Sequence, residues 1–119
     1  MTYHACVWID QREAKIFELS ATDVAASHVS DGKPHHHLHS KDEHAHQEML
    51  ADVAARLKPA KAILIVGPGQ AKTAFKHYLD VHNPDIAKNV WDVQASDHPT
   101  DAQVVAAARS WFHAQDRMH

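Results

Sequence analysis

The sequence contains a single cysteine, Cys6, so no disulfide can form within the chain. It has no apolar run near the ~20 residues that a bilayer-spanning helix needs. Residues 1–8 also lack the basic start and the long apolar block of a signal peptide. These absences predict a protein of the reducing cytoplasm without a membrane partner. Because Cys6 stands in an apolar strand pattern, we expect its thiol to be buried and unreactive.

Positive charge is also scarce. The 12 lysines and arginines are outnumbered by 15 aspartates and glutamates, and the net charge of −3 argues against a broadly basic surface for nucleic acid. Histidine is the residue in excess, with 13 copies. Because the unperturbed pKa of histidine is about 6.5, mild acidification would make a local histidine-rich patch cationic.

The strongest structural signal lies in residues 61–72. Residues 63–66 (Ile-Leu-Ile-Val) form an apolar run that stops at Gly67, Pro68 and Gly69, and a helical pattern follows directly. An apolar run bounded by turn residues predicts a strand that is buried on both faces. A strand, a glycine turn and a helix in succession predict half of an α/β unit.

Further strand and helix patterns surround this stretch. Strands are predicted over residues 4–9, 14–19, 23–30 and 63–66, and a fifth within 86–93, centred on 89–93. Capping boxes at residues 40–43 and 100–103 open two helices that are expected to end near residues 57 and 115. A third helix is predicted over residues 70–81.

The order β-β-β-α-β-α-β-α predicts a single α/β domain over residues 1–119, with a mixed five-stranded sheet and three helices. This order occurs in ribonuclease H-like and translation-machinery folds. The helical residues expected to face inward are Met49, Leu50, Val53, Ala54, Leu57, Phe75, Tyr78, Leu79, Val104, Val105, Ala108 and Phe112. We also expect the three tryptophans, Trp8, Trp91 and Trp111, in the core and not in a base-stacking surface.

Three sets of residues resemble a known family. Residues 7–10 (Val-Trp-Ile-Asp) with 12–17 (Arg-Glu-Ala-Lys-Ile-Phe) are similar to the opening hairpin of the middle domain of archaeal and eukaryotic class-I release factors and Pelota. Residues 62–72 resemble the strand of that domain that ends in a Gly-Pro-Gly turn, with a lysine in the next helix. Residues 96–100 (Ser-Asp-His-Pro-Thr) resemble bacterial single-domain relatives called translational machinery proteins. The resemblance spans nearly the whole chain and implies the translational machinery component fold.

The chain departs from the release factors between its third strand and its first helix. There the release factors carry a Gly-Gly-Gln loop for peptide release, whereas this chain has residues 33–39 (Lys-Pro-His-His-His-Leu-His). Gly69 and Gln70 are not a substitute, because they follow the central strand. The resemblance therefore implies a non-catalytic accessory or stress factor, similar to Pelota-like proteins that also lack the motif, with the ribosome or RNA as its partner.

The histidine-rich loop at residues 31–40 is the first candidate site. Histidine stacks on bases and, when protonated, binds phosphate, and the matching loop of release factors enters the ribosome. The residues expected to contact RNA or the ribosome are Lys33, His35, His36, His37, His39 and Lys41. Neutral imidazole also binds zinc and nickel, and the candidate ligands for such an ion are His35, His37, His39 and His44. The alternatives are thus a histidine-rich metal-binding module and a solvated loop; the main hypothesis requires no cofactor.

The second candidate site consists of Gly67, Gly69 and Lys72. A glycine turn that opens a helix exposes amides and the positive end of the helix dipole, so it can bind an anion with Lys72 one turn into the helix. The Gly-Lys-Ser/Thr ending of a phosphate-binding loop is missing. The alternative is a tight turn that packs the helix closely against the strand.

The third candidate site is acidic. Asp10 ends the first strand, where ribonuclease H-like nucleases place a metal-binding aspartate. A two-metal site needs several converging carboxylates. The candidates for convergence with Asp10 are Glu48, Asp52, Asp97 and Asp101. The alternative, which we favour, is that Asp10 shapes the hairpin turn with Gln11 and Arg12. A metal-dependent nuclease is therefore the third hypothesis, and the sequence favours a protein without enzymatic activity.

Overall fold

Three antiparallel strands begin the fold. The computed structural model describes the backbone of residues 4–30 and 39–118 and the side chains of residues 4–30 and 46–116. The first strands are β1 (His4–Ile9), β2 (Glu13–Leu19) and β3 (Val24–Ser30), paired in that order. In β2, Phe17 and Leu19 are buried on one face of the sheet and Ala14 and Ile16 on the other. This is the alternation that the sequence predicts for a strand covered on both sides.

Helices alternate with the two remaining strands. These elements are α1 (His39–Arg56), β4 (Ala62–Gly67), α2 (Ala71–His82), α3 (Pro84–Ala87), β5 (Val90–Ala95) and α4 (Asp101–Met118). Within the described ranges, no helix combines the length and the apolar character that crossing a membrane requires.

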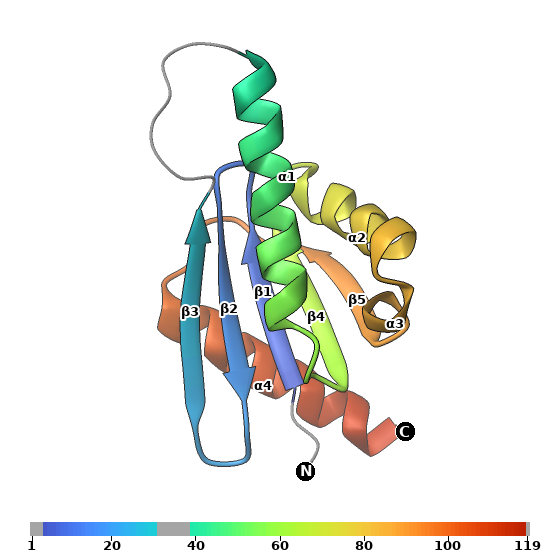
Figure 1. The fold of residues 1–119 in the computed structure, drawn as a ribbon. Helices are drawn as coiled ribbons and strands as arrows, with labels where there is room; N and C mark the ends of the chain where they lie inside the picture. The colour runs from blue at the N-terminus through green and yellow to red at the C-terminus, as the bar shows by residue number, and fades with distance from the viewer. Residues whose placement is uncertain (1–3, 31–38, 119) are drawn as a thin grey trace.

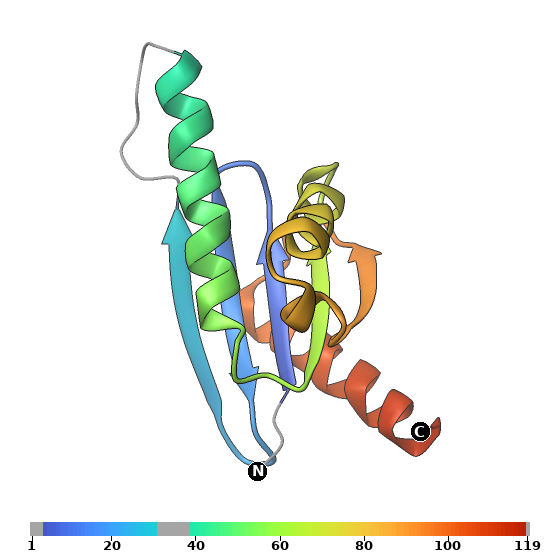
Figure 2. The same ribbon diagram turned by 45° about the vertical axis from the view of Figure 1, so that its right-hand side comes forward.

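The sheet is mixed and has the strand order β3-β2-β1-β4-β5. β1 pairs antiparallel with β2 and parallel with β4, and β4 pairs parallel with β5. Figures 1 and 2 show α1, α2 and α3 on one face of the sheet and α4 on the other. The predicted α/β class and the mixed five-stranded sheet are confirmed, whereas residues 4–30 and 39–118 contain four helices where the sequence predicted three.

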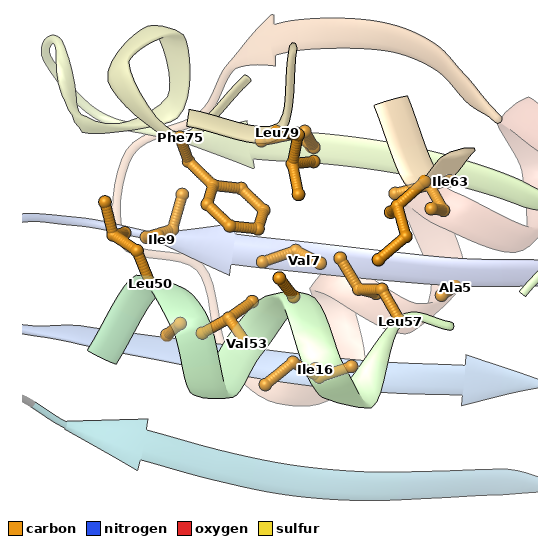
Figure 3. Packing of buried hydrophobic residues seen from close by; sticks show 14 of the residues in the cluster. Ala5, Val7, Ile9, Ile16, Leu50, Val53, Leu57, Ile63, Phe75 and Leu79 are labelled. Carbon is orange, nitrogen blue, oxygen red and sulfur yellow. The ribbon is translucent and has the colours of Figure 1, made fainter. Parts of the chain in front are cut away.

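The larger core lies between the sheet and the helices α1 and α2. Figure 3 shows the side chains of Val53 and Leu57 from α1 and of Phe75 and Leu79 from α2 over Val7 of β1. All five are fully buried. The 3–4 spacing of apolar residues therefore identified the buried stripe of both helices correctly.

The smaller core lies on the opposite face, under α4. Val104, Ala108 and Phe112 of α4 are buried there together with Trp8 and Phe17 of the sheet. The helix begins with the predicted capping box: Gln103 donates its backbone N–H to Thr100 Oγ1 at 3.2 Å, and Thr100 donates its own to Gln103 Oε1 at 2.8 Å. The helix continues to Met118, beyond the predicted end near residue 115.

Two other boundaries were predicted wrongly. The sequence placed the fifth strand within residues 86–93, centred on 89–93, whereas β5 spans Val90–Ala95 and Ile86 is buried in α3. Pro84 ends α2 and at the same time starts a new turn, because its fixed φ suits the first helical position. Helix α1 begins at His39, so Ser40 lies within the helix and is not its N-cap as predicted.

The tryptophans do not all lie in the core. Trp8 is buried and Trp111 packs partly buried against the α4 core, as predicted. Trp91 on the edge strand β5 is 37% exposed, so the prediction of a core position for Trp91 is wrong.

Cys6 lies in β1 beneath α4 and is 1% exposed. Burial raises the pKa of its thiol to about 12, so the nucleophilic thiolate is absent near neutral pH. We expect the native protein to resist a thiol-specific colorimetric reagent at mildly alkaline pH, and the urea-unfolded chain to react completely within minutes. A native protein that reacts as fast as the unfolded chain would contradict the burial of this thiol.

Candidate functional site

The sequence-predicted sites gather at one end of the sheet. Because β1, β4 and β5 are parallel, their carboxyl ends lie at the same edge, and β3 ends and α1 begins there too (Figure 1). In open α/β sheets this edge is where ligands bind. Three described loops form it, at residues 10–13, 67–70 and 96–100.

Asp10 organises the turn between β1 and β2. Its Oδ1 accepts the backbone N–H of Arg12 at 2.8 Å and of Glu13 at 2.9 Å, and its own N–H donates to the Glu13 carbonyl at 3.0 Å. This is the local bonding that favours aspartate in turns. The structure therefore supports the turn role of Asp10 over a role as metal ligand.

The carboxylates proposed for a nuclease centre do not form one. Asp52 pairs with Arg56 at 3.1 Å, and Asp101 pairs with Lys15 at 3.1 Å. Among the residues whose side chains the structure describes, no group of three or more histidine, cysteine, aspartate or glutamate residues is arranged to hold a metal ion. The nuclease hypothesis gains no geometric support from these residues.

The glycine turn after β4 combines close packing with a lysine. A Cβ atom on Gly67, whose φ is +154°, would lie 2.1 Å from the carbonyl oxygen of Ile9 in the neighbouring strand. Gly69 has φ +60° and open space around it, and its carbonyl accepts a hydrogen bond from Lys72 Nζ at 2.5 Å. The tight-turn alternative thus has a structural reason at Gly67. Lys72 Nζ is engaged by the Gly69 carbonyl in this turn, and anion binding there stays a prediction.

The loop at residues 96–100 is fixed to the ends of two strands. Trp8 Nε1 donates to the Asp97 carbonyl at 2.8 Å, and the Ser96 N–H donates to the Gly67 carbonyl at 3.0 Å. His98 lies with its ring centroid 5.3 Å from that of Trp8, and its Nδ1 is 3.0 Å from Asp97 Oδ1. Sequence reasoning missed Trp8 as the residue that holds this loop, although a buried indole N–H needs a partner.

The histidine-rich segment lies largely outside the described residues. The strand before it, β3, ends at Ser30 at the end of the sheet that carries the three loops, and the first turn of α1 after it projects beyond that end (Figure 1). The predicted contacts whose side chains lie outside the described part are Lys33, His35, His36, His37, His39, Lys41 and His44. RNA contact and zinc or nickel binding by these residues therefore stay predictions.

A hollow of about 380 Å³ lies at the opposite end of the molecule, between α4 and the β2–β3 turn. Arg109 crosses to that turn and donates to the Ser20 carbonyl at 2.7 Å and to the Asp23 carbonyl at 2.9 Å. His4 Nε2 lies 3.5 Å from Asp116 Oδ1 in the wall of the hollow. Because both contacts join residues far apart in the chain, no sequence pattern pointed to them.

Solved structures resemble this chain, whereas the comparisons of its sequence found no match. No protein-family model matches the sequence, and no curated protein is significantly similar to it. Pelota from Archaeoglobus fulgidus matches with a TM-score of 0.69 and 21% identity, over 91% of this chain and 31% of that one. The archaeal translation termination factor aRF1 matches with a TM-score of 0.62 and 12% identity, over 96% of this chain and 40% of that one.

A third match extends this likeness to a eukaryotic protein. Dom34 from S. cerevisiae, a translation termination-like factor involved in RNA quality control pathways and interacting with Hbs1, has a TM-score of 0.52 and 9% identity. The match covers 79% of this chain and 29% of Dom34. The chain thus spans between 29% and 40% of these proteins and resembles one domain of release-factor-like proteins, as its motifs predicted.

Proposed function

We propose that this chain is a non-catalytic accessory factor of translation in the cytoplasm that associates with the ribosome or its RNA. The observation that carries the proposal is the match of 79–96% of the chain to one domain of Pelota, aRF1 and Dom34. Two of these are described as a translation termination factor and a translation termination-like factor.

The absence of the release motif supports a role without peptide hydrolysis. The three glycines of the chain are Gly32, Gly67 and Gly69, and no two are adjacent, so a Gly-Gly-Gln tripeptide does not occur. Gly67 packs against the Ile9 carbonyl, and Gly69 forms the turn before α2. Both are thus engaged in structural roles at the end of β4.

The contact surface in this proposal is the edge formed by the carboxyl ends of the parallel strands. The residues proposed to contact RNA or the ribosome are Lys33, His35, His36, His37, His39 and Lys41. Imidazole rings stack on unpaired bases, and protonated rings bind phosphate. The loop at residues 96–100, held by Trp8, and the turn with Lys72 follow β5 and β4 at the end of the sheet where β3 also ends.

Sucrose-gradient profiles of lysates test this function. We expect the wild-type protein to sediment with ribosomal particles in growing, starved or acid-stressed cells, and to be released by high salt because phosphate contacts are salt-sensitive. Replacing His35, His36, His37 and His39 by alanine should move most of the protein to the top fractions. The matched control, His77→Ala with His82→Ala on the exposed side of α2, should sediment as the wild type does. A wild-type protein that stays at the top under all three conditions would overturn the proposal.

A further inference from the structure

Four rings form a cluster at the end of the sheet away from the histidine-rich segment. The ring centroid of Trp91 lies 6.0 Å from that of His4, 6.4 Å from that of Trp111 and 6.0 Å from that of Phe112. These rings come from β1, β5 and α4, and we call them the aromatic ledge. Phe112 forms its buried base, whereas Trp91 remains 37% exposed. The ledge thus presents an indole to solvent that other aromatic rings hold in place.

Trp91 lies at a break in strand pairing and faces the opposite side of the sheet from its neighbour Val90. Ile63 of β4 pairs with Val90, but the next residue, Leu64, pairs with Asp92, so Trp91 is an extra residue in the edge strand. Such an extra residue is a β-bulge. Val90 packs toward the α1–α2 core, while Trp91 turns to the α4 face and meets Trp111. The exposure of Trp91 is therefore built into the sheet and does not come from a loose terminus.

Three exposed lysines lie on the two connections that lead into β4 and β5. Asn89 donates from Nδ2 to the Ala60 carbonyl at 3.3 Å and accepts the Ile63 N–H at 2.9 Å, which joins the α1–β4 and α3–β5 connections. The exposed lysines on these connections are Lys58, Lys61 and Lys88. Among the described residues none of them has an ion-pair partner, in contrast to Lys15 and Lys76.

The chain connects these lysines closely to the ledge. Lys88 precedes Trp91 by three residues, a span of at most about 10 Å. Lys61 precedes Ala62, which pairs with His4 of the ledge. The nearest acidic neighbour in sequence, Asp92, accepts the Val93 N–H at 2.9 Å and Gln94 Nε2 at 3.0 Å and keeps its negative charge. Asp116 lies 3.5 Å from His4 of the ledge. The three lysines outnumber these two carboxylates, so the segments around the ledge carry a small excess of positive charge.

We propose that the aromatic ledge and Lys58, Lys61 and Lys88 bind single-stranded RNA. The lysines contact the phosphates, and an unpaired base stacks on the exposed indole of Trp91, which is how single strands are bound without sequence preference. A protein partner is less favoured because lysine is depleted in the cores of protein interfaces. The choice of RNA over DNA rests on the proposed function, but His4 of the ledge begins β1, at the opposite end of the sheet from Ser30, where β3 ends before the histidine-rich segment.

Fluorescence anisotropy with a labelled single-stranded oligouridine tests the inference. We expect binding that weakens with salt, about 10-fold or more weaker binding for Trp91→Ala, and near wild-type binding for Trp91→Phe. Replacing the three lysines by glutamine should reduce the slope of log affinity against log salt by about 2. The control, Lys76→Gln with Val81→Ala on α2, should bind as the wild type does. Equal urea midpoints for all variants would show that folding is unchanged.

Several results would overturn the inference and leave the proposed function standing. One is a wild-type protein that sediments with ribosomes but does not bind oligouridine. Another is a Trp91→Ala protein that binds oligouridine with unchanged affinity. Binding of double-stranded RNA as tight as that of oligouridine would exclude base stacking. Finally, self-association abolished by Trp91→Ala, without oligouridine binding, would assign the ledge to a protein interface. Oligouridine binding by a wild-type protein absent from ribosome fractions would support the ledge and overturn the proposed function.

Discussion

Replacing Gly67 by alanine is expected to lower the free energy of unfolding by about 3 kcal/mol or more. The added Cβ would lie 2.1 Å from the carbonyl oxygen and 3.1 Å from the carbonyl carbon of Ile9. Both atoms belong to the backbone of the adjacent buried strand, so β1 and β4 must separate to relieve the contact. The φ of +154° adds strain for any residue with a side chain. Urea unfolding followed by circular dichroism measures the loss.

Gly69→Ala is the matched control for this substitution. Gly69 also has a positive φ, +60°, but a Cβ there would meet no atom within 4 Å. We expect only the cost of the left-handed conformation, about 1–2 kcal/mol. Equal losses at the two positions would show that backbone conformation, and not the contact with Ile9, makes Gly67 necessary.

Phe75→Ala is expected to lower the free energy of unfolding by about 3–5 kcal/mol. Phe75 is fully buried, and its ring lies between α2 and the sheet, pointing toward Val7 and Ile9 of β1 (Figure 3). Truncation leaves a cavity because the rigid strand β1 and helix α1 cannot collapse into it. In urea unfolding, the midpoint concentration should fall, while the slope of the unfolding free energy against urea concentration stays the same.

The control for Phe75 lies six residues further along the same helix. Val81 is 60% exposed, so Val81→Ala removes methyl groups that touch mainly water. We expect a change within about 0.5 kcal/mol. If Val81→Ala lost as much stability as Phe75→Ala, core packing would not explain the loss at Phe75, because alanine is the better helix former at both positions and only Phe75 is buried.

Most of the fold was predictable because its patterns are local. The apolar stripe of α1, with Val53 and Leu57, depends only on 3–4 spacing, and the buried run of β4 only on its bounding glycines. The role of Asp10 was predictable for the same reason, since its carboxylate bonds to backbone amides two and three residues away. Such bonds form within a few residues, so the sequence order alone specifies them.

The features that were missed depend on contacts between distant segments. Nothing near Arg109 in the sequence indicates that its guanidinium binds the carbonyls of Ser20 and Asp23. The bulge at Trp91 depends on how β5 fits beside Ile63 and Leu64 of β4. Local hydrophobicity placed Trp91 in the core, but the sequence does not show that β5 is the last strand of the sheet, with a neighbouring strand on one side only.

The parallel pairing of β1 with β4 has a consequence for synthesis of the protein. His4 pairs with Ala62, so the nascent β1–β2 hairpin leaves the ribosome well before its other neighbour exists. At about 5–20 residues per second, this interval is on the order of seconds. During that time the apolar edge of β1 is open to pairing with other chains. The yield of folded protein should therefore depend on elongation speed and on chaperones that shield this strand.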